Sequence, residues 1–143
     1  MGTYRFTIRV EASPETVFSA WTDLDRMTEW VGGVTGVSGL SGPIDVPGTR
    51  YTVHFGGMRS ATEILEVERP HHIRTRFGNA ILRGESDVRF DAHGDGTRLT
   101  QEYRTHGIVP AIAARIFATG WWRGSFRGEL EAFGRMVEDE RHR

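Results

Sequence analysis

The chain has 143 residues, of which 26% are charged, with a formal net charge of −1 and no cysteine. This length is typical of one domain that buries about 70% of the surface of its unfolded chain, so we expect a single domain over residues 1–143. The balanced charge argues against a nucleic-acid partner, because such a partner calls for a concentrated basic surface. No apolar stretch approaches membrane-spanning length and no signal peptide is recognisable. We therefore expect a cytoplasmic protein that does not insert into membranes.

The amino-acid usage excludes several kinds of chemistry. Without cysteine the chain has no disulfide, thiolate nucleophile or iron–sulfur ligand. All eighteen basic residues are arginine, so no lysine Schiff base can form. The six histidines show no metal-ligand spacing, and neither a Gly-x-Ser-x-Gly nucleophile nor a phosphate-binding glycine loop is present. We expect no metal site and no cofactor.

The N-terminal third reads as a strand followed by two short helices. Alternating apolar residues predict a strand over 4–10. Ser13 can cap a helix, and Pro14 suits the first helical position. A second short helix is expected over 23–30, with Asp23 as its cap.

Glycine-punctuated strands make up the middle of the chain. Alternating apolar and charged residues predict six of them, over 34–40, 50–55, 58–68, 73–77, 82–90 and 98–104. A final helix is expected over about 108–141. The alternation of apolar and charged residues along these strands predicts an antiparallel sheet with one solvent-exposed face and one face covered by this helix. Arginines and carboxylates are interleaved on the charged face, so we expect cross-strand ion pairs there.

This order of elements resembles the START/polyketide-cyclase superfamily (SRPBCC). The N-terminal signature that carries the resemblance is Ala12-Ser13-Pro14-x-x-Val17-Phe18-x-x-Trp21-x-Asp23, followed by Trp30. The resemblance implies an α+β helix-grip fold, in which a curved antiparallel sheet surrounds a long C-terminal helix and two short helices follow the first strand. It also implies a hydrophobic cavity that holds lipids, sterols, quinones or polyketides, or supports chemistry on them.

The expected cavity lies between the inner face of the sheet and the final helix. Two predicted inward residues are polar where a core needs apolar groups, namely Ser86 and Gln101. A buried amide without partners costs ~1–3 kcal/mol. We therefore expect Gln101 to hydrogen-bond either a ligand or a neighbouring group of the protein. Tyr103 offers a hydroxyl group on the same face of the same strand. The predicted lining is Tyr51, Val53, Phe77, Leu82, Ser86, Gln101, Tyr103, Ile112, Ile116 and Gly120.

Three glycines at four-residue spacing interrupt the final helix, at Gly120, Gly124 and Gly128. Each costs about 1 kcal/mol relative to alanine inside a helix. The apolar residues before and after them lie on different faces, which predicts a bend or local unwinding at the glycines, with Gly120 leaving space for a ligand. Alternatively, the glycines allow close approach to a strand or to a second subunit, so a homodimer stays open.

Two functions from different classes fit these features. The first is binding of a small hydrophobic or aromatic ligand; the second is a cyclase or aromatase that uses the same cavity, with Tyr103 and Gln101 as its best catalytic candidates. The inward residues include no carboxylate or histidine, although a one-residue slip in register would turn Glu63, His54 or Glu102 inward. A third reading is an interaction module with a filled core.

Overall fold

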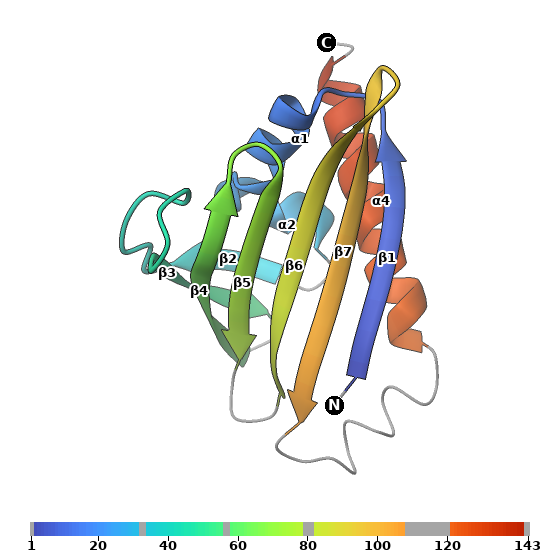
Figure 1. The fold of residues 1–143 in the computed structure, drawn as a ribbon. Helices are drawn as coiled ribbons and strands as arrows, with labels where there is room; N and C mark the ends of the chain where they lie inside the picture. The colour runs from blue at the N-terminus through green and yellow to red at the C-terminus, as the bar shows by residue number, and fades with distance from the viewer. Residues whose placement is uncertain (1, 32–33, 56–57, 79–81, 108–120, 142–143) are drawn as a thin grey trace.

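The computed structural model describes residues 2–31, 34–55, 58–78, 82–107 and 121–141. Within these ranges, seven strands form one antiparallel sheet in the order β1-β7-β6-β5-β4-β3-β2 (Figure 1). The strands are β1 (Gly2–Val10), β2 (Val34–Ser38), β3 (Arg50–Phe55), β4 (Met58–Glu68), β5 (His72–Gly78), β6 (Leu82–His93) and β7 (Gly96–Gly107). The helices are α1 (Pro14–Trp21), the 3₁₀ helix η1 (Leu24–Arg26), α2 (Met27–Trp30) and α4 (Trp121–Arg141). The curved sheet and long C-terminal helix confirm the predicted helix-grip architecture.

The predicted cap of the first helix is present. The Ser13 hydroxyl accepts a hydrogen bond from the Thr16 amide at 3.3 Å, and Pro14 occupies the first turn. The prediction for 23–30 was only partly right, because this segment is the 3₁₀ turn η1 followed by one turn of α-helix. The Asp23 side chain makes no capping bond, and the Met27 amide bonds Leu24, three residues back, which is the tighter 3₁₀ spacing.

Cross-strand pairing arranges the concave face of the sheet in rows. The register contains no slip that would turn Glu102 inward, since Glu102 pairs with Arg5 and Asp87 on the convex face. One row is wholly apolar, the next contains a glutamine, and the third contains four hydroxyl groups. The rows are Ile8–Leu99–Phe90, then Phe6–Gln101–Val88–Ile73, then Tyr4–Tyr103–Ser86–Thr75.

The closed core lies at the apolar end of these rows, under the C-terminal half of α4. Its fully buried members include Phe18, Phe90, Leu99, Leu130, Phe133 and Val137. Trp21 stacks against Trp30 with ring centroids 4.9 Å apart, and both rings contact Phe133 edge-on at 5.1 Å. Both tryptophans are partly buried and pack against the core.

Helix α4 differs from the expectation based on its glycines. It runs without interruption through Gly124 and Gly128, so the local unwinding predicted there is absent; Gly120 lies outside the described residues. Gly128 is exposed, and a Cβ atom added to it would meet nothing within 4 Å, so it does not serve close packing. The glycine that approaches a strand is Gly134, whose added Cβ would lie 3.5 Å from Ile8 on β1.

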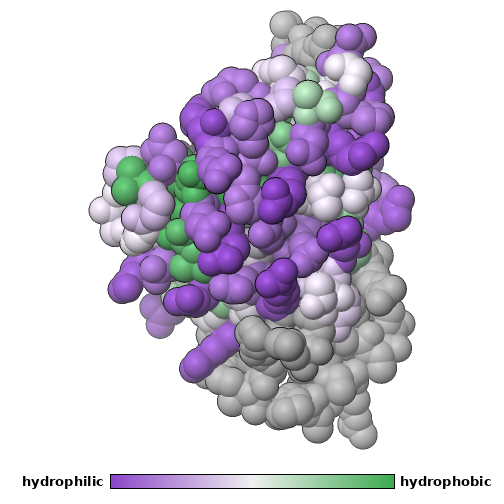
Figure 2. All heavy atoms as spheres, in the orientation of Figure 1, coloured by the Kyte–Doolittle hydropathy of each residue, from purple (hydrophilic) through white to green (hydrophobic). Residues whose placement is uncertain are grey.

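The convex face of the sheet is hydrophilic, as Figure 2 shows over β5, β6 and β7. Cross-strand ion pairs join Arg5 to Glu102 at 3.0 Å and Arg74 to Glu66 at 3.3 Å, which confirms the predicted paired surface. None of the helices in the described ranges combines the length and apolar character that a bilayer crossing requires.

Candidate functional site

A buried polar cluster on the concave face is the centre of the candidate site. The amide nitrogen of Gln101 donates to the Ser86 hydroxyl at 3.2 Å and to the Tyr103 phenol oxygen at 2.7 Å. Ser86 and Tyr103 are paired across β6 and β7, and Gln101 lies two residues from Tyr103 on the same face. The alternation of these strands therefore brings together three residues that the sequence had marked as inward and polar.

The cluster leaves hydrogen-bonding capacity unused. Both bonds of Gln101 leave from Nε2, so its amide oxygen Oε1 has no partner in the described part of the chain. The Ser86 hydroxyl accepts from Gln101, and no acceptor for its own proton exists among the described residues. Gln101 is only 5% exposed and Ser86 only 7%. The site thus contains one uncommitted acceptor and one uncommitted donor, both on largely buried residues.

Aromatic rings border the polar cluster. The Tyr103 ring contacts Phe6 and Phe77 edge-on, with centroids 6.5 Å and 6.0 Å away. Phe77 lies over Gly84, where an added Cβ would come within 2.9 Å of the Phe77 ring. Edge-to-face contacts of this kind hold rings in place, so the phenol group of Tyr103 has a fixed position.

A carboxylate on α4, Glu129, acts electrostatically on Tyr103, which the sequence reasoning missed. Burial raises the pKa of the Tyr103 phenol well above its usual range, the Glu129 charge raises it further, and the bond from Gln101 opposes both. Tyr103 therefore keeps its proton at neutral pH and is suited to donate a hydrogen bond. Glu129 stands four residues before the buried Phe133 on α4, and this helical spacing is the signal that could have placed it near the sheet.

A second polar pair lies on the same concave face, at β3 and β4. Tyr51 is 8% exposed, and its side chain hydrogen-bonds that of the cross-strand neighbour Thr62, which is 7% exposed. Burial raises the pKa of Tyr51 to about 12, although the bond with Thr62 lowers it. Tyr51 was a predicted lining residue, whereas Thr62 was not recognised.

The structure describes only some of the remaining residues that were predicted to line the cavity. Val53 is partly buried on β3 and packs against the core. Leu82 is the first residue of β6, but its side chain lies outside the described part of the structure. Ile112, Ile116 and Gly120 lie outside the described residues altogether, so the wall they were expected to form stays a prediction.

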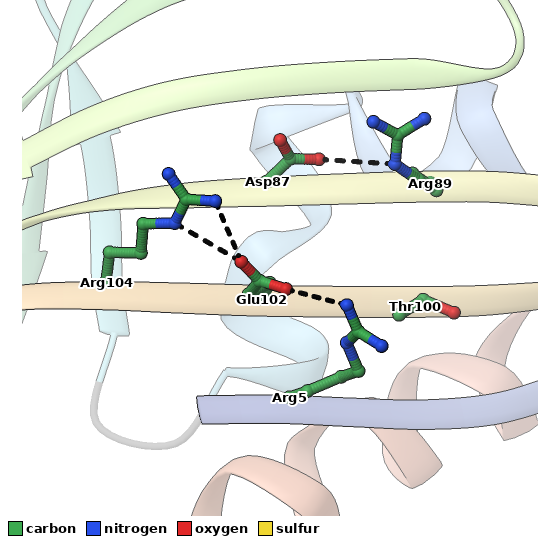
Figure 3. A pocket seen from close by; sticks show the side chains of 6 residues that line it. All are labelled: Arg5, Asp87, Arg89, Thr100, Glu102 and Arg104. Atoms are coloured by element: carbon green, nitrogen blue, oxygen red, sulfur yellow. Dashed lines mark hydrogen bonds and ion pairs between the residues drawn. The ribbon is translucent and has the colours of Figure 1, made fainter. Parts of the chain in front are cut away.

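The convex face has its own pocket, of about 210 Å³, lined by Arg5, Asp87, Arg89, Thr100, Glu102 and Arg104 (Figure 3). Glu102 lies between Arg5 and Arg104 at 3.0 Å and 3.1 Å, and Asp87 faces Arg89 at 3.9 Å. The three arginines of this pocket share two carboxylates, because Glu102 faces both Arg5 and Arg104. No group of three His, Asp or Glu side chains in the described ranges is arranged to hold a metal ion.

Solved structures of the same fold span nearly the whole chain. Protein MLL2253 from Mesorhizobium loti matches with a TM-score of 0.77 at 19% identity, covering 96% of this chain and 98% of that one. TTHA0849 from Thermus thermophilus matches with a TM-score of 0.72 at 16% identity, covering 95% and 97%. DynU16, described as a putative protein in the dynemicin biosynthetic locus, has a TM-score of 0.69 at 22% identity, covering 95% of this chain and 47% of that one.

No curated protein sequence is significantly similar to the chain. A family model does match, over residues 1–138, and its description is "Polyketide cyclase / dehydrase and lipid transport". This match covers almost the entire sequence and agrees with the helix-grip fold of the structural neighbours. The chain belongs to the polyketide cyclase/dehydrase and lipid transport family, of SRPBCC type.

Proposed function

We propose that the protein binds a small hydrophobic or aromatic ligand, of the lipid, quinone or polyketide type, between the concave face of the sheet and the C-terminal helical segment. The observation that carries the proposal is the Ser86–Gln101–Tyr103 cluster, which leaves an amide oxygen unpaired on a largely apolar face. A ligand that donates to this oxygen would complete the hydrogen bonding of the cluster, whereas a filled apolar core offers it no donor.

Two comparisons support this class of ligand. The family description joins polyketide cyclases with lipid transport, and both activities require an apolar small molecule to enter the protein. DynU16 is described as part of a biosynthetic locus, which fits a ligand made by a dedicated pathway. The proposal takes the chain as one domain acting in the cytoplasm, with neither a nucleic-acid partner nor membrane insertion, and a homodimer is compatible with it.

A cyclase or aromatase activity is the alternative, and Glu129 favours it. The cavity would fold a flexible polyketide-like chain so that ring closure costs less entropy. Tyr103, whose phenol stays protonated, would donate a hydrogen bond to a carbonyl oxygen of the substrate and so polarise it. Gln101 would hold the phenol in place. The Glu129 charge would raise the pKa of the phenol. Glu129 would supply the titratable group that this chemistry needs, because its charge acts on the Tyr103 phenol.

Ligand capture by the purified protein tests the binding proposal. Native mass spectrometry should detect a copurified small molecule, and the neutral probe N-phenyl-1-naphthylamine should gain fluorescence on binding. Gly120→Leu should weaken probe binding while circular dichroism shows an intact fold. Gly128→Leu is the matched control, because Gly128 faces open space, and it should leave the affinity unchanged. Absence of both a copurified molecule and probe binding would refute a hydrophobic site.

Comparison of the parent with Tyr103→Phe separates binding from catalysis. With an aromatic polyketide analogue, a carrier should lose affinity in the variant and form no product. A cyclase should bind the analogue equally well but lose about a hundredfold in rate, with a bell-shaped pH profile.

A further inference from the structure

The unused hydrogen-bonding groups of the cluster specify what kind of ligand fits. Gln101 Oε1 can accept one hydrogen bond, and the Ser86 hydroxyl can donate one. Both groups belong to one cluster, in which Gln101 Nε2 lies 3.2 Å from Ser86 Oγ. A single hydroxyl group can satisfy both, because it accepts from Ser86 through a lone pair and donates to Gln101 through its proton.

The free acceptor of the cluster disfavours an anion. Both bonds of Gln101 leave from Nε2, so a ligand carboxylate in this position would face Gln101 Oε1 without a proton to share. No arginine side chain of the described residues hydrogen-bonds Gln101 or Ser86, whereas the convex face is rich in arginine.

Resting on the ligand-binding function proposed above, we infer that Ser86 and Gln101 form a specificity subsite for a neutral hydroxyl group, a phenol, an enol or an alcohol, on an apolar body. Tyr103 fixes the Gln101 amide through the 2.7 Å bond, and the amide oxygen Oε1, which can only accept, discriminates against carboxylates such as free fatty acids. The hydroxyl group is thus the feature that distinguishes the preferred ligand from hydrocarbons and from acids of the same size.

Four probes that share one ring system test this inference, by displacement of N-phenyl-1-naphthylamine at pH 7. They are 2-naphthol, 2-methoxynaphthalene, naphthalene and 2-naphthoate. We expect 2-naphthol to bind about tenfold tighter than 2-methoxynaphthalene, because the ether cannot donate to Gln101 Oε1. We expect 2-naphthoate to bind more weakly than naphthalene.

Variants assign these preferences to the named residues. Ser86→Ala should reduce the preference for 2-naphthol over naphthalene, whereas Ser60→Ala should keep it, since Ser60 is also a buried serine but lies on β4 beside Val53.

The outcomes separate the two proposals. If none of the four probes displaces the reporter and the reporter itself does not bind, the ligand-binding function fails. If naphthalene binds but 2-naphthol binds no better than 2-methoxynaphthalene, the hydroxyl subsite is wrong although the binding function stands. An unchanged preference in Ser86→Ala would also overturn the subsite.

Discussion

The Phe77 ring lies directly over Gly84, its cross-strand neighbour on β6. A Cβ atom added to Gly84 would come within 2.9 Å of Phe77 Cζ and within contact distance of the Arg104 carbonyl oxygen on β7. Only glycine permits this approach, and the ring it accommodates also contacts Tyr103 edge-on. Gly84 is therefore part of the support for the polar cluster, through Phe77.

Gly84→Ala should destabilise the protein by about 1–3 kcal/mol, because overpacking displaces the ring or the backbone of β7. The free energy of unfolding from urea denaturation measures this. Gly36→Ala is the matched control, since Gly36 is also a strand glycine but its added Cβ would meet nothing within 4 Å. Equal unfolding midpoints for the two variants would show that the approach at Gly84 is not tight.

Gly128→Ala should stabilise the protein by about 1 kcal/mol. Gly128 is an exposed residue inside α4 with open space around it, so alanine removes the helix penalty of glycine without a clash. Thermal unfolding followed by circular dichroism measures the change. Ala132→Gly, in the same helix, should produce a loss of similar size; a loss of stability in Gly128→Ala would mean that the glycine serves a contact.

Trp21→Ala should cost about 3–5 kcal/mol of stability, as large-to-small changes at packed aromatic sites do. Its ring contacts Trp30, Phe90 and Phe133. Leu40→Ala is the control, because Leu40 is 52% exposed and should change stability by less than about 0.5 kcal/mol. Similar denaturation curves for the two variants would show that Trp21 does not contribute to the packing of the core.

Alkaline titration should reveal the buried tyrosine Tyr51. Its pKa is raised to about 12 in the folded protein, against about 10 in the unfolded chain. Between these values the unfolded state has lost a proton that the folded state retains, so the free energy of unfolding falls by about 1.4 kcal/mol per pH unit for this group. Tyr51→Phe should remove this contribution. An identical slope in the parent and the variant would contradict the burial of a protonated phenol.

Glu102→Gln should lower stability at neutral pH by less than about 1 kcal/mol. The hydrogen bond from Arg5, and then that from Arg104, lower the pKa of Glu102 in the folded state. Its stabilising contribution is therefore present above the unfolded pKa of about 4.3 and disappears as the pH falls through the lower folded value. The two arginine side chains are 70% and 55% exposed, so added salt should also shrink the difference. A difference in the free energy of unfolding between parent and variant that persists in strong acid would show that the ionised carboxylate of Glu102 is not its cause.

Local sequence patterns predicted the strands and the faces of the sheet. Alternation placed Ser86, Gln101 and Tyr103 on the concave side, and the register confirms it, because side chains alternate strictly along a strand. The cap at Ser13 was equally predictable, since it depends on residues within one helical turn. The same local reasoning misjudged Asp23 and the glycines of α4, where a local preference does not decide the conformation.

The sequence by itself therefore determined the element order and the inward position of the polar residues, because these follow from periodicity and from contacts between near neighbours. It indicated the helix-grip fold through the family resemblance of its N-terminal signature. The tertiary structure alone decided that Gln101 Nε2 bonds both Ser86 and Tyr103, and that Glu129 acts on the phenol of Tyr103. It also decided that Gly134, and not Gly128, faces β1. The reason is physical: the bonds of Gln101 depend on the cross-strand register of β6 and β7, and the contacts of Glu129 and Gly134 depend on the position and rotation of α4 against the sheet, which the packing of Phe133, Leu130 and Val137 into the core sets.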